Sequence, residues 1–411
     1  MPEPRYRVLQ VCSHPQQYTS FIVRQMTQHP KLDVLVAYCR GPNGKQNHDS
    51  ASRPEEGWGV PLLEGYSWVE VPNKSSKPHL DGFFSLVNPG LWDLVRKRKF
   101  DVIQLLLGHA CASFWIALSA ARGRRIPVLF GNDVTTLVSP QHKIWEFPLK
   151  RLLLPRIFKL ADVLLAPSTA TADLFRDLGV PSERIALIPS IVDNERWTRE
   201  AAEADRALTR ASWGLADGWP VVLFCSELQP WKRPQDLLQA FARAKAPQAH
   251  LIFAGEGSMR QQLESEAKAL GLEERVHFVG SIEQSQRPAA YKAANLLVLP
   301  SDRDHYPTAV CEAMICGCPV VISNEIRGRF DLIWQGITGF TYPAGNVRVL
   351  SQILSNVLRD PDQLQRLSAA ARRRMEKWSP RENVEAQIQA IEQALRLRPR
   401  SKSGRRLRQN P

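Results

Sequence analysis

Two acidic residues frame the stretch DHYPTAVCE, where a binding site for hydroxyl groups is the first chemistry to consider. Asp304 and Glu312 lie eight positions apart on either side of Pro307, and the apolar run PVVIS follows them. An ionised carboxylate only accepts hydrogen bonds and can take two hydroxyl donors at once, so it suits a vicinal diol. The alternative is that both are ordinary acids, one in a loop and one in the first turn of a helix.

The segment between these acids leads into the start of a predicted helix. The first N–H groups of a helix have no partner within it, and the positive end of the helix dipole lies there, so a diphosphate is favoured. Phosphate binding is therefore expected around residues 308–310. The candidate binding residues of this segment are Tyr306, Pro307, Thr308, Ala309 and Val310.

Positive charge is available in the stretch SELQPWKRP, residues 226–234. Lys232 is a compact cation, and Arg233 stands next to it. Neighbouring side chains need not point the same way. The alternative for each is a solvated basic residue at a helix start.

These residues stand at the ends of short apolar runs that alternate with helical patterns along the whole chain. Continuous apolar strands alternating with helices predict parallel sheets covered on both faces. Two such sets predict an α/β protein of two doubly wound, Rossmann-like domains facing a central cleft, because ligands of open α/β sheets bind at the carboxyl ends of strands. The runs are YRVLQVCS, LDVLVAYC, DVIQLLLG, IPVLFGND, DVLLAPS and RIALIPS, then PVVLFCSE, HLIFAGEG, RVHFVGS, NLLVLPS and PVVISNE.

The break between the two sets falls in the polar, Ala-rich stretch of residues 190–220, which has no strand character. We expect a first domain over residues 1–195 and a second over 210–379. A helix predicted over about 380–397 is a candidate to pack back on the first domain. Residues 398–411 are expected to form a disordered basic tail.

The composition is that of a soluble globular protein, with 411 residues, 44% hydrophobic and 23% charged. The stretch of residues 103–121 is long enough for a membrane span, but Gly108, His109 and Ser113 within it favour strand, loop and helix instead. The N-terminal segment lacks the apolar core of a signal peptide. The seven cysteines are odd in number and lie mostly in apolar runs, which favours reduced, buried thiols in a cytoplasmic protein.

Neither a metal nor a dinucleotide cofactor is expected. Cys311, Cys316 and Cys318 include no Cys-x-x-Cys pair and have no nearby histidine. The segment GEGSMR lacks the third glycine of the dinucleotide fingerprint, and the turn SHPQQY after the first strand has none.

The net charge of +13 is uneven, because residues 396–411 carry seven basic side chains and no acid. Such a tail predicts attraction to an anionic membrane surface; no nucleic-acid partner is expected. A second candidate for a membrane-facing surface is the segment KIWEFPLKRLLLPRIFKL, which mixes basic residues with leucines and aromatics. The alternative for that segment is an amphipathic helix leading into the strand DVLLAPS.

Over about residues 180–380 the sequence resembles the family 4 retaining glycosyltransferases, which have the GT-B fold. The blocks that carry the resemblance are ELQPWKRPQDLLQAF, LIFAGEGSMRQQLE, VHFVGSIEQ, NLLVLPSDRDHYPTAVCEAMICGCPVVIS and GITGF, in this order. In the first half, the segments SHPQQYTSFIVRQMTQHPKLDVLVAYC and WGVPLLEGYSWVEVPN resemble a bacterial subgroup associated with surface polysaccharides.

The resemblance implies a role for each acid and each cation of the second half. It implies that Asp304 meets hydroxyls of the donor sugar, although the family usually has the longer Glu there, and that Glu312 takes the ribose hydroxyls. It implies that Lys232 binds the donor diphosphate. The arginine usual five residues earlier is Glu227 here, and Arg233 is a candidate to supply the missing charge.

For the first domain, the resemblance implies an acceptor-side site at the strand ends. His109 is similar to a histidine near the reacting sugar, although a lone histidine is more often structural than catalytic. Asp133 is a candidate to orient the acceptor or His109. His14 and Gln16 lie where the family commonly has a Gly-Gly pair.

The resemblance thus implies a cytoplasmic, metal-independent, retaining glycosyltransferase. It would move a hexose from a UDP- or GDP-linked donor, a substrate rather than a cofactor, to a glycan or lipid-linked acceptor in surface polysaccharide synthesis. The inner face of the cell membrane is an alternative location. The alternative functions are a sugar-nucleotide epimerase with the same fold and a non-catalytic sugar-nucleotide-binding protein.

Overall fold

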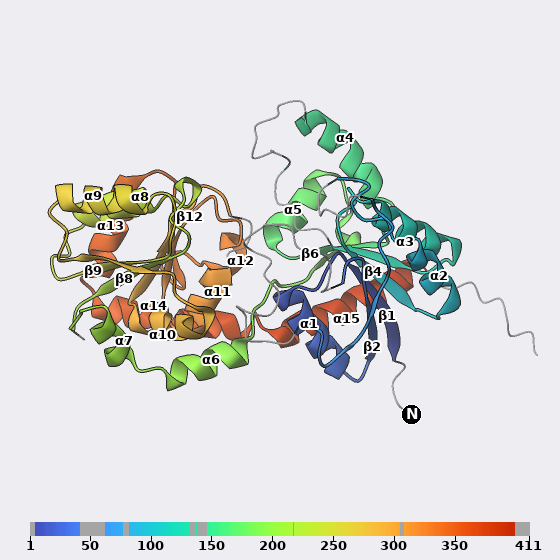
Figure 1. Ribbon diagram of the computed structural model, residues 1–411, viewed down its shortest axis with the longest axis horizontal. Coiled ribbons are helices and arrows are strands. Elements are labelled where there is room, and N and C mark those ends of the chain that lie inside the picture. Colours follow the sequence, from blue (N-terminus) through green and yellow to red (C-terminus); the bar gives the residue numbers. More distant parts are fainter. Residues whose placement is uncertain are drawn as a thin grey trace, which may run out of the picture. The chain divides into compact units, whose positions relative to one another are not determined.

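The described chain of the computed structural model forms two α/β units (Figure 1), which confirms the prediction of two doubly wound domains. The structure describes residues 5–41, 62–76, 82–131, 137, 146–216, 218–304 and 308–398. The first unit contains the chain up to Pro167, Thr171–Ile188 and the chain from Val384 on. The second contains Ser168–Ala170 and Pro189–Asn383.

The first unit is built on a parallel sheet with the strand order β3-β2-β1-β4-β5-β6-β7. Alternate residues of each strand point to opposite faces, so Leu9 and Val11 of β1 join one core and Val8 and Cys12 join the other. The strands are β1 (Tyr6–Cys12), β2 (Leu32–Tyr38), β3 (Ser67–Glu70), β4 (Val102–Leu106), β5 (Val128–Gly131), β6 (Val163–Ala166) and β7 (Ile185–Leu187).

Helices cover both faces of this sheet. The first core is closed by α2 (Gly90–Lys97), α3 (Ala112–Gly123), α4 (Glu146–Phe158) and α5 (Thr169–Asp177). The second core is closed by α1 (Gln17–Gln28) and α15 (Pro380–Leu397). The apolar stretch of residues 103–121 is β4, a loop and the start of α3, as predicted. No helix among the described residues is long and apolar enough to span a bilayer.

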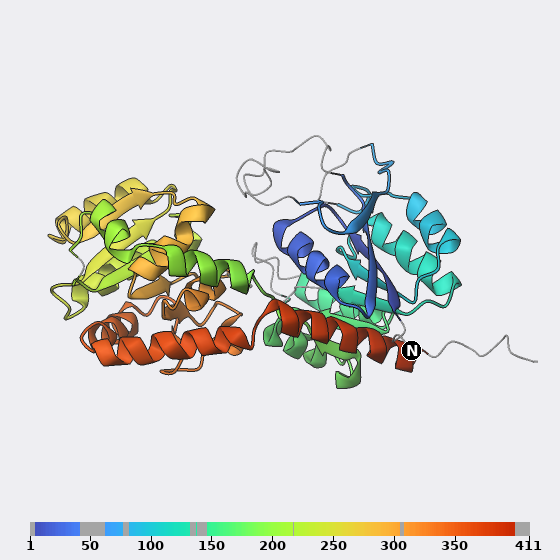
Figure 2. The ribbon, with the colours of Figure 1, turned by 90° about the horizontal axis from the view of Figure 1, so that it is seen from below.

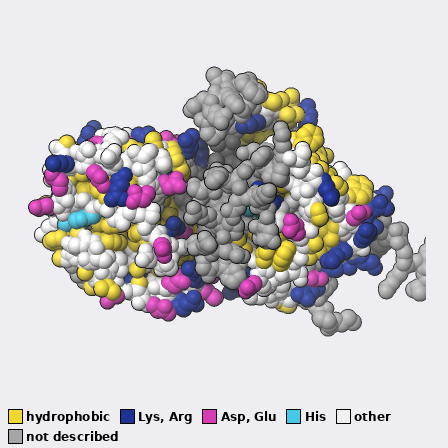
Figure 3. All heavy atoms as spheres, viewed as in Figure 1, with side chains coloured by type: hydrophobic (Ala, Val, Ile, Leu, Met, Phe, Trp, Pro, Cys, Tyr) yellow, Lys and Arg dark blue, Asp and Glu magenta, His cyan; other side chains and the backbone are white. Residues whose placement is uncertain are grey.

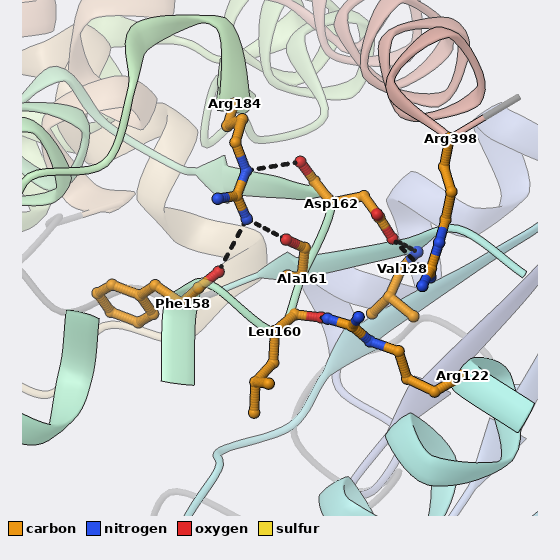
Figure 4. A network of polar contacts seen from close by, with 8 residues as sticks. All are labelled: Arg122, Val128, Phe158, Leu160, Ala161, Asp162, Arg184 and Arg398. Carbon is orange, nitrogen blue, oxygen red and sulfur yellow. Dashed lines mark hydrogen bonds and ion pairs between the residues drawn. The ribbon is translucent and has the colours of Figure 1, made fainter. Parts of the chain in front are cut away.

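The last helix, drawn in red in Figure 2, is held to the first unit by buried polar contacts as well as by its apolar side chains. The Gln104 amide nitrogen donates to the Gln387 side chain at 2.8 Å, and Gln10 donates to Gln104 at 2.6 Å. At the end of the helix Arg398 pairs with Asp162 at 3.4 Å, and the same carboxylate accepts the backbone N–H of Val128 (Figure 4). These contacts join the chain end to β1, β4 and β5.

The second unit has a parallel sheet with the strand order β10-β9-β8-β11-β12-β13. Its core packs the sheet against α8, α9 and α13, while α6, α7, α10, α11 and α14 contact one another. The strands are β8 (Val221–Cys225), β9 (His250–Ala254), β10 (Val276–Gly280), β11 (Leu296–Leu299), β12 (Val320–Ser323) and β13 (Gly339–Tyr342). The helices are α6 (Asn194–Glu203), α7 (Arg206–Ser212), α8 (Pro234–Arg243), α9 (Arg260–Ala269), α10 (Arg287–Ala293), α11 (Thr308–Ile315), α12 (Arg329–Leu332), α13 (Val347–Val357) and α14 (Pro361–Glu376).

The polar stretch without strand character folds as α6 and α7 of the second unit. Arg210 of α7 is fully buried, and its guanidinium donates to the carbonyl oxygens of Ala293 and Trp219 and to the side chain of Asn295. A buried guanidinium is tolerated only where its donors are satisfied. This polar segment is therefore part of the domain.

Candidate functional site

A cavity of about 540 Å³ lies in the second unit, at the carboxyl ends of β8, β9, β10 and β11. Strand β8 has β9 on one side and β11 on the other, so the chain changes direction across the sheet at this point. Open α/β sheets bind ligands at such a position. The cavity therefore marks the candidate site of this domain.

Two glycines allow the loops that wall this cavity to pack closely. A Cβ atom on Gly255 would overlap the carbonyl oxygen of Ser226, and one on Gly257 would overlap that of Leu228. The loop after β9 is also tied to the loop after β8 by the Leu228 N–H, which donates to the carbonyl oxygen of Glu256 at 2.9 Å. The GEG segment thus serves loop packing, and Gly255 and Glu256 line the cavity.

The structure brings together Lys232 and Asp304, which are far apart in the sequence. The Lys232 Nζ atom lies 2.8 Å from Asp304 Oδ2, and both side chains are more than four-fifths buried at the cavity wall. Nζ also lies 4.0 Å from the ring centroid of Trp231, a cation–π contact. The two charges neutralise each other in a partly desolvated place.

Arg233, the other predicted cation, does not line the cavity. Its guanidinium pairs with Asp236 at 2.7 Å, and this hydrogen bond raises the pKa of Arg233. Its backbone adopts the left-handed conformation, with φ of 53°, which is uncommon for a residue with a Cβ atom.

Glu312 is fully buried and does not line the cavity. It is the fifth residue of α11, which begins at Thr308, so it lies just beyond the first turn in which it was expected. The Tyr291 hydroxyl donates to Glu312 Oε2 at 3.1 Å, and Arg287 Nη1 lies 4.0 Å from the same oxygen. Burial raises the pKa of Tyr291 well above its usual value, which keeps this hydroxyl a donor.

The start of α11 borders the cavity. Thr308 and Ala309 line it, whereas Val310 is fully buried. The positive end of the helix dipole therefore adjoins the cavity, as expected for an anion site. Tyr306 and Pro307 lie outside the described residues.

Several cavity residues were not predicted from the sequence. Arg287 and Tyr291 reach the cavity from α10, Ser281 and Ile282 follow β10, and Cys225 ends β8. The position of these last three residues at or directly after a strand end was a usable signal, since ligands gather at strand ends. Arg287 and Tyr291 carried no such signal, because they stand in a short helix.

In the first unit, His14 and Gln16 lie together in the loop after β1. The Ser13 hydroxyl lies 2.9 Å from His14 Nδ1, and Gln16 Nε2 lies 3.2 Å from His14 Nε2. Burial, with a smaller effect of Arg40, lowers the pKa of His14. The imidazole is therefore neutral near pH 7.

His109 follows β4, the neighbour of β1, so both histidines belong to the same edge of the sheet. Its ring meets Phe130 edge-on at 6.5 Å, and burial lowers its pKa. Its buried Nδ1 atom has no hydrogen-bond partner among the described residues. Asp133 lies outside the described residues.

Comparisons with known proteins agree with these two domains. Residues 205–374 match the family model described as glycosyl transferases group 1, and residues 7–190 match the glycosyl transferase 4-like domain. A GDP-mannose-dependent alpha-(1-6)-phosphatidylinositol monomannoside mannosyltransferase of Mycolicibacterium smegmatis is 29% identical over 74% of this chain and 82% of its own length.

Two further proteins extend the comparison. A D-inositol 3-phosphate glycosyltransferase of Xylanimonas cellulosilytica is 27% identical over 59% of this chain, which spans 60% of the length of that relative. The crystal structure of Anabaena Alr3699/HepE in complex with UDP matches with a TM-score of 0.68 and 20% identity, over 94% of this chain and 99% of that one. This likeness shows a shared fold.

Proposed function

We propose that this chain, which belongs to the group 1 glycosyltransferases and has the GT-B fold, moves a hexose from a UDP- or GDP-linked donor to a glycan or lipid-linked acceptor. The observation that carries the proposal is the Lys232–Asp304 pair, which lies in the cavity beside the start of α11. A cation and a helix N-terminus are the groups that bind a diphosphate, and a carboxylate beside them suits sugar hydroxyls.

Lys232 stabilises the negative charge that develops on the leaving diphosphate, and the start of α11 adds its dipole. Because Asp304 already holds the ammonium group in place, little reorganisation is needed when the donor enters. These fixed charges make the reaction metal-independent in this proposal. Asp304 contacts the sugar. In this proposal Glu312 meets the donor ribose only after its fully buried side chain, which does not line the cavity, becomes accessible.

The acceptor belongs to the first domain, where His14, Gln16 and His109 offer neutral hydrogen-bonding groups. A neutral imidazole can position a sugar hydroxyl without attracting the diphosphate. The reaction retains the anomeric configuration by attack on the same face, and the leaving phosphate accepts the proton of the acceptor hydroxyl. This removes the need for a protein nucleophile.

A membrane-bound acceptor is supported by the surface of α4. Leu149, Leu152 and Leu153 are 46%, 56% and 44% exposed, at the spacing of one helix face, and Arg151 and Arg156 are exposed beside them. Figure 3 shows hydrophobic and basic side chains in the region of α4. No acid occurs between residues 147 and 161, so this face complements an anionic lipid surface. We therefore place the enzyme at the inner face of the cell membrane, in surface polysaccharide synthesis.

The experiment is a donor screen followed by an acceptor assay. Thermal shift with UDP- and GDP-sugars identifies the donor, because a ligand that binds only the folded state raises the melting temperature. The donor is then incubated with lipid-linked sugar acceptors, with and without EDTA, and the anomeric configuration of the product is determined by NMR. Transfer with retention in EDTA supports the proposal. Conversion of the donor without an acceptor would instead indicate an epimerase.

A further inference from the structure

The cavity of the second unit is lined by two basic side chains, Lys232 and Arg287. Lys232 is already matched by Asp304 at 2.8 Å. Two exposed acids, Glu227 and Glu256, also line the cavity and make its rim less attractive to an anion. A sugar-linked diphosphate carries a negative charge on each phosphate, so one matched cation is a weak counter-charge for it.

Arg287 is built into the cavity wall at the first residue of α10. Its Nη1 atom lies 4.0 Å from Oε2 of the fully buried Glu312, and its own side chain is 37% exposed. The Tyr291 hydroxyl donates to the same oxygen at 3.1 Å, so the carboxylate has a fixed position. A guanidinium has five N–H donors in a rigid fork, so it can face Glu312 with one side and a phosphate with another.

The other nearby arginines are arranged differently. Arg233 pairs with Asp236 at 2.7 Å, and Arg303 lies over the Trp231 ring at 5.9 Å; neither lines the cavity. Arg287 thus combines two features that they lack, contact with the cavity and a fully buried acidic partner.

We infer that Arg287 is the second diphosphate-binding cation of the donor site, with Glu312 and Tyr291 as residues that position it. The inference rests on the proposed function and deepens it. Arg287 gives bidentate hydrogen bonds to phosphate oxygens, while Lys232 acts as a point charge. Glu312 is fully buried and does not line the cavity, so its task here is to orient the guanidinium.

The first test compares ligands with and without phosphate. Calorimetry measures UDP and GDP, and NMR titration measures uridine and guanosine, which bind more weakly. Arg287→Ala should weaken binding of the preferred diphosphate about tenfold to a hundredfold and leave the nucleoside unchanged. Arg287→Lys should recover part of the loss, because it keeps the charge but not the fork. The matched control is Arg366→Ala on α14, which removes an equal charge from a side chain that is 69% exposed and pairs with Asp360.

The second test asks whether Tyr291 acts through Arg287. Tyr291→Phe removes the hydrogen bond to Glu312 without changing a charge, so we expect a few-fold loss of diphosphate affinity. Added to Arg287→Ala it should cause no further loss, because the two changes disturb one network. A purely structural Tyr291 would instead give additive losses and a lower melting temperature in both backgrounds.

The outcomes separate this inference from the proposed function. If the unmodified protein binds UDP or GDP and Arg287→Ala binds it equally well, or loses nucleoside affinity to the same extent, the assignment of Arg287 is wrong and the proposed function stands. If the unmodified protein binds neither diphosphate, both are overturned.

Discussion

The carboxyl edges of the two sheets differ in charge, although both sheets are parallel and both place polar loops after their strands. In the second domain the edge holds opposite charges in contact, as in Lys232 with Asp304 and Arg287 with Glu312. In the first domain the loops after β1 and β4 hold His14 and His109, whose pKa burial lowers, so they are neutral near pH 7. Arg40, which follows β2, lies close enough to lower the pKa of His14 as well. Fixed charges suit a leaving diphosphate, and neutral groups suit an acceptor hydroxyl. The difference indicates a division of labour between the two domains.

The largest effect on turnover should come from removing Lys232, the cation that Asp304 holds in place at the donor site. Lys232→Ala should lower turnover about 100-fold or more, because one well-placed stabiliser of developing charge contributes a few kcal/mol. Single-turnover kinetics with the donor identified above measures this, and circular dichroism checks folding. A folded variant with near-normal turnover would show that the charged edge is not the leaving-group site.

The two acids should differ in what they recognise. Glu312→Gln should weaken the free nucleoside diphosphate and the intact donor alike, by about 1.5–3 kcal/mol, because a hydrogen-bonded charged partner is lost. Asp304→Asn should impair only the sugar-bearing donor. The free diphosphate should bind at least as well, since the variant releases Lys232 from its ion pair.

Calorimetry with both ligands on both variants decides this. Should Asp304→Asn weaken the free diphosphate as much as Glu312→Gln does, Asp304 would serve to position Lys232, and its assignment to the sugar would have to be given up.

The burial of a strand decided whether it could be predicted from the sequence. Central strands were recognised because both faces are buried and their residues are continuously apolar, as in β8 and β11. The edge strands β3 and β13 were missed. Both have four residues, and three of the four in β3 are exposed, so neither shows a long apolar run.

Within the site, the residue types were predictable but their partners were not. Lys232 and Asp304 were each singled out, yet no local pattern indicates that they contact each other. The order of the strands in the sheet brings these two distant loops together, and that order is not visible in a short segment. Arg287 was missed for the same reason, since its importance comes from the buried Glu312 behind it. Strand ends and helix starts can be predicted from local sequence, whereas ion pairs across a cavity can be identified only when the fold is known.

A smaller effect is expected on membrane binding, where a surface of the first domain is compared with a surface of the second. Changing Leu152 and Leu153 of α4 together to Glu should weaken binding to anionic vesicles about tenfold, because apolar contact is lost and charge repulsion is added. The matched control is Leu208→Glu on α7 of the second domain, where the leucine is 69% exposed. Co-sedimentation with vesicles at several salt concentrations measures both.

Deletion of residues 399–411, which keeps the Arg398–Asp162 ion pair, completes this comparison. It should remove most of the salt-dependent part of binding, because the five like charges of this segment are screened at high ionic strength. Equal binding by all variants at every salt concentration would show that neither surface recruits the protein to lipid.

The smallest effect should appear in the pH dependence, which distinguishes the neutral edge from the charged one. His14 and His109 have a pKa below the usual value of about 6.5, so both stay neutral at pH 7 and gain protons only at lower pH. Turnover at saturating donor should therefore be flat from pH 8 to 7 and fall a few-fold by about pH 6 and below as the acceptor edge becomes positive. Donor affinity should stay constant, because none of the described residues that line the donor cavity is a histidine.

The free energy of unfolding should change in the same direction. The unfolded chain binds protons first as the pH falls below about 6.5, so these histidines lower stability on acidification until the folded protein is protonated too. His109→Gln, which keeps a polar side chain, should flatten the turnover profile and reduce the slope of the stability profile, to which the lowered pKa values of His250 and His277 also contribute. His29→Gln at the C-terminal end of α1 should not change the turnover profile. If donor affinity fell in parallel with turnover, the titrating group would belong to the donor site of the second domain. The distinction between a neutral acceptor site and a charged donor site would then be lost.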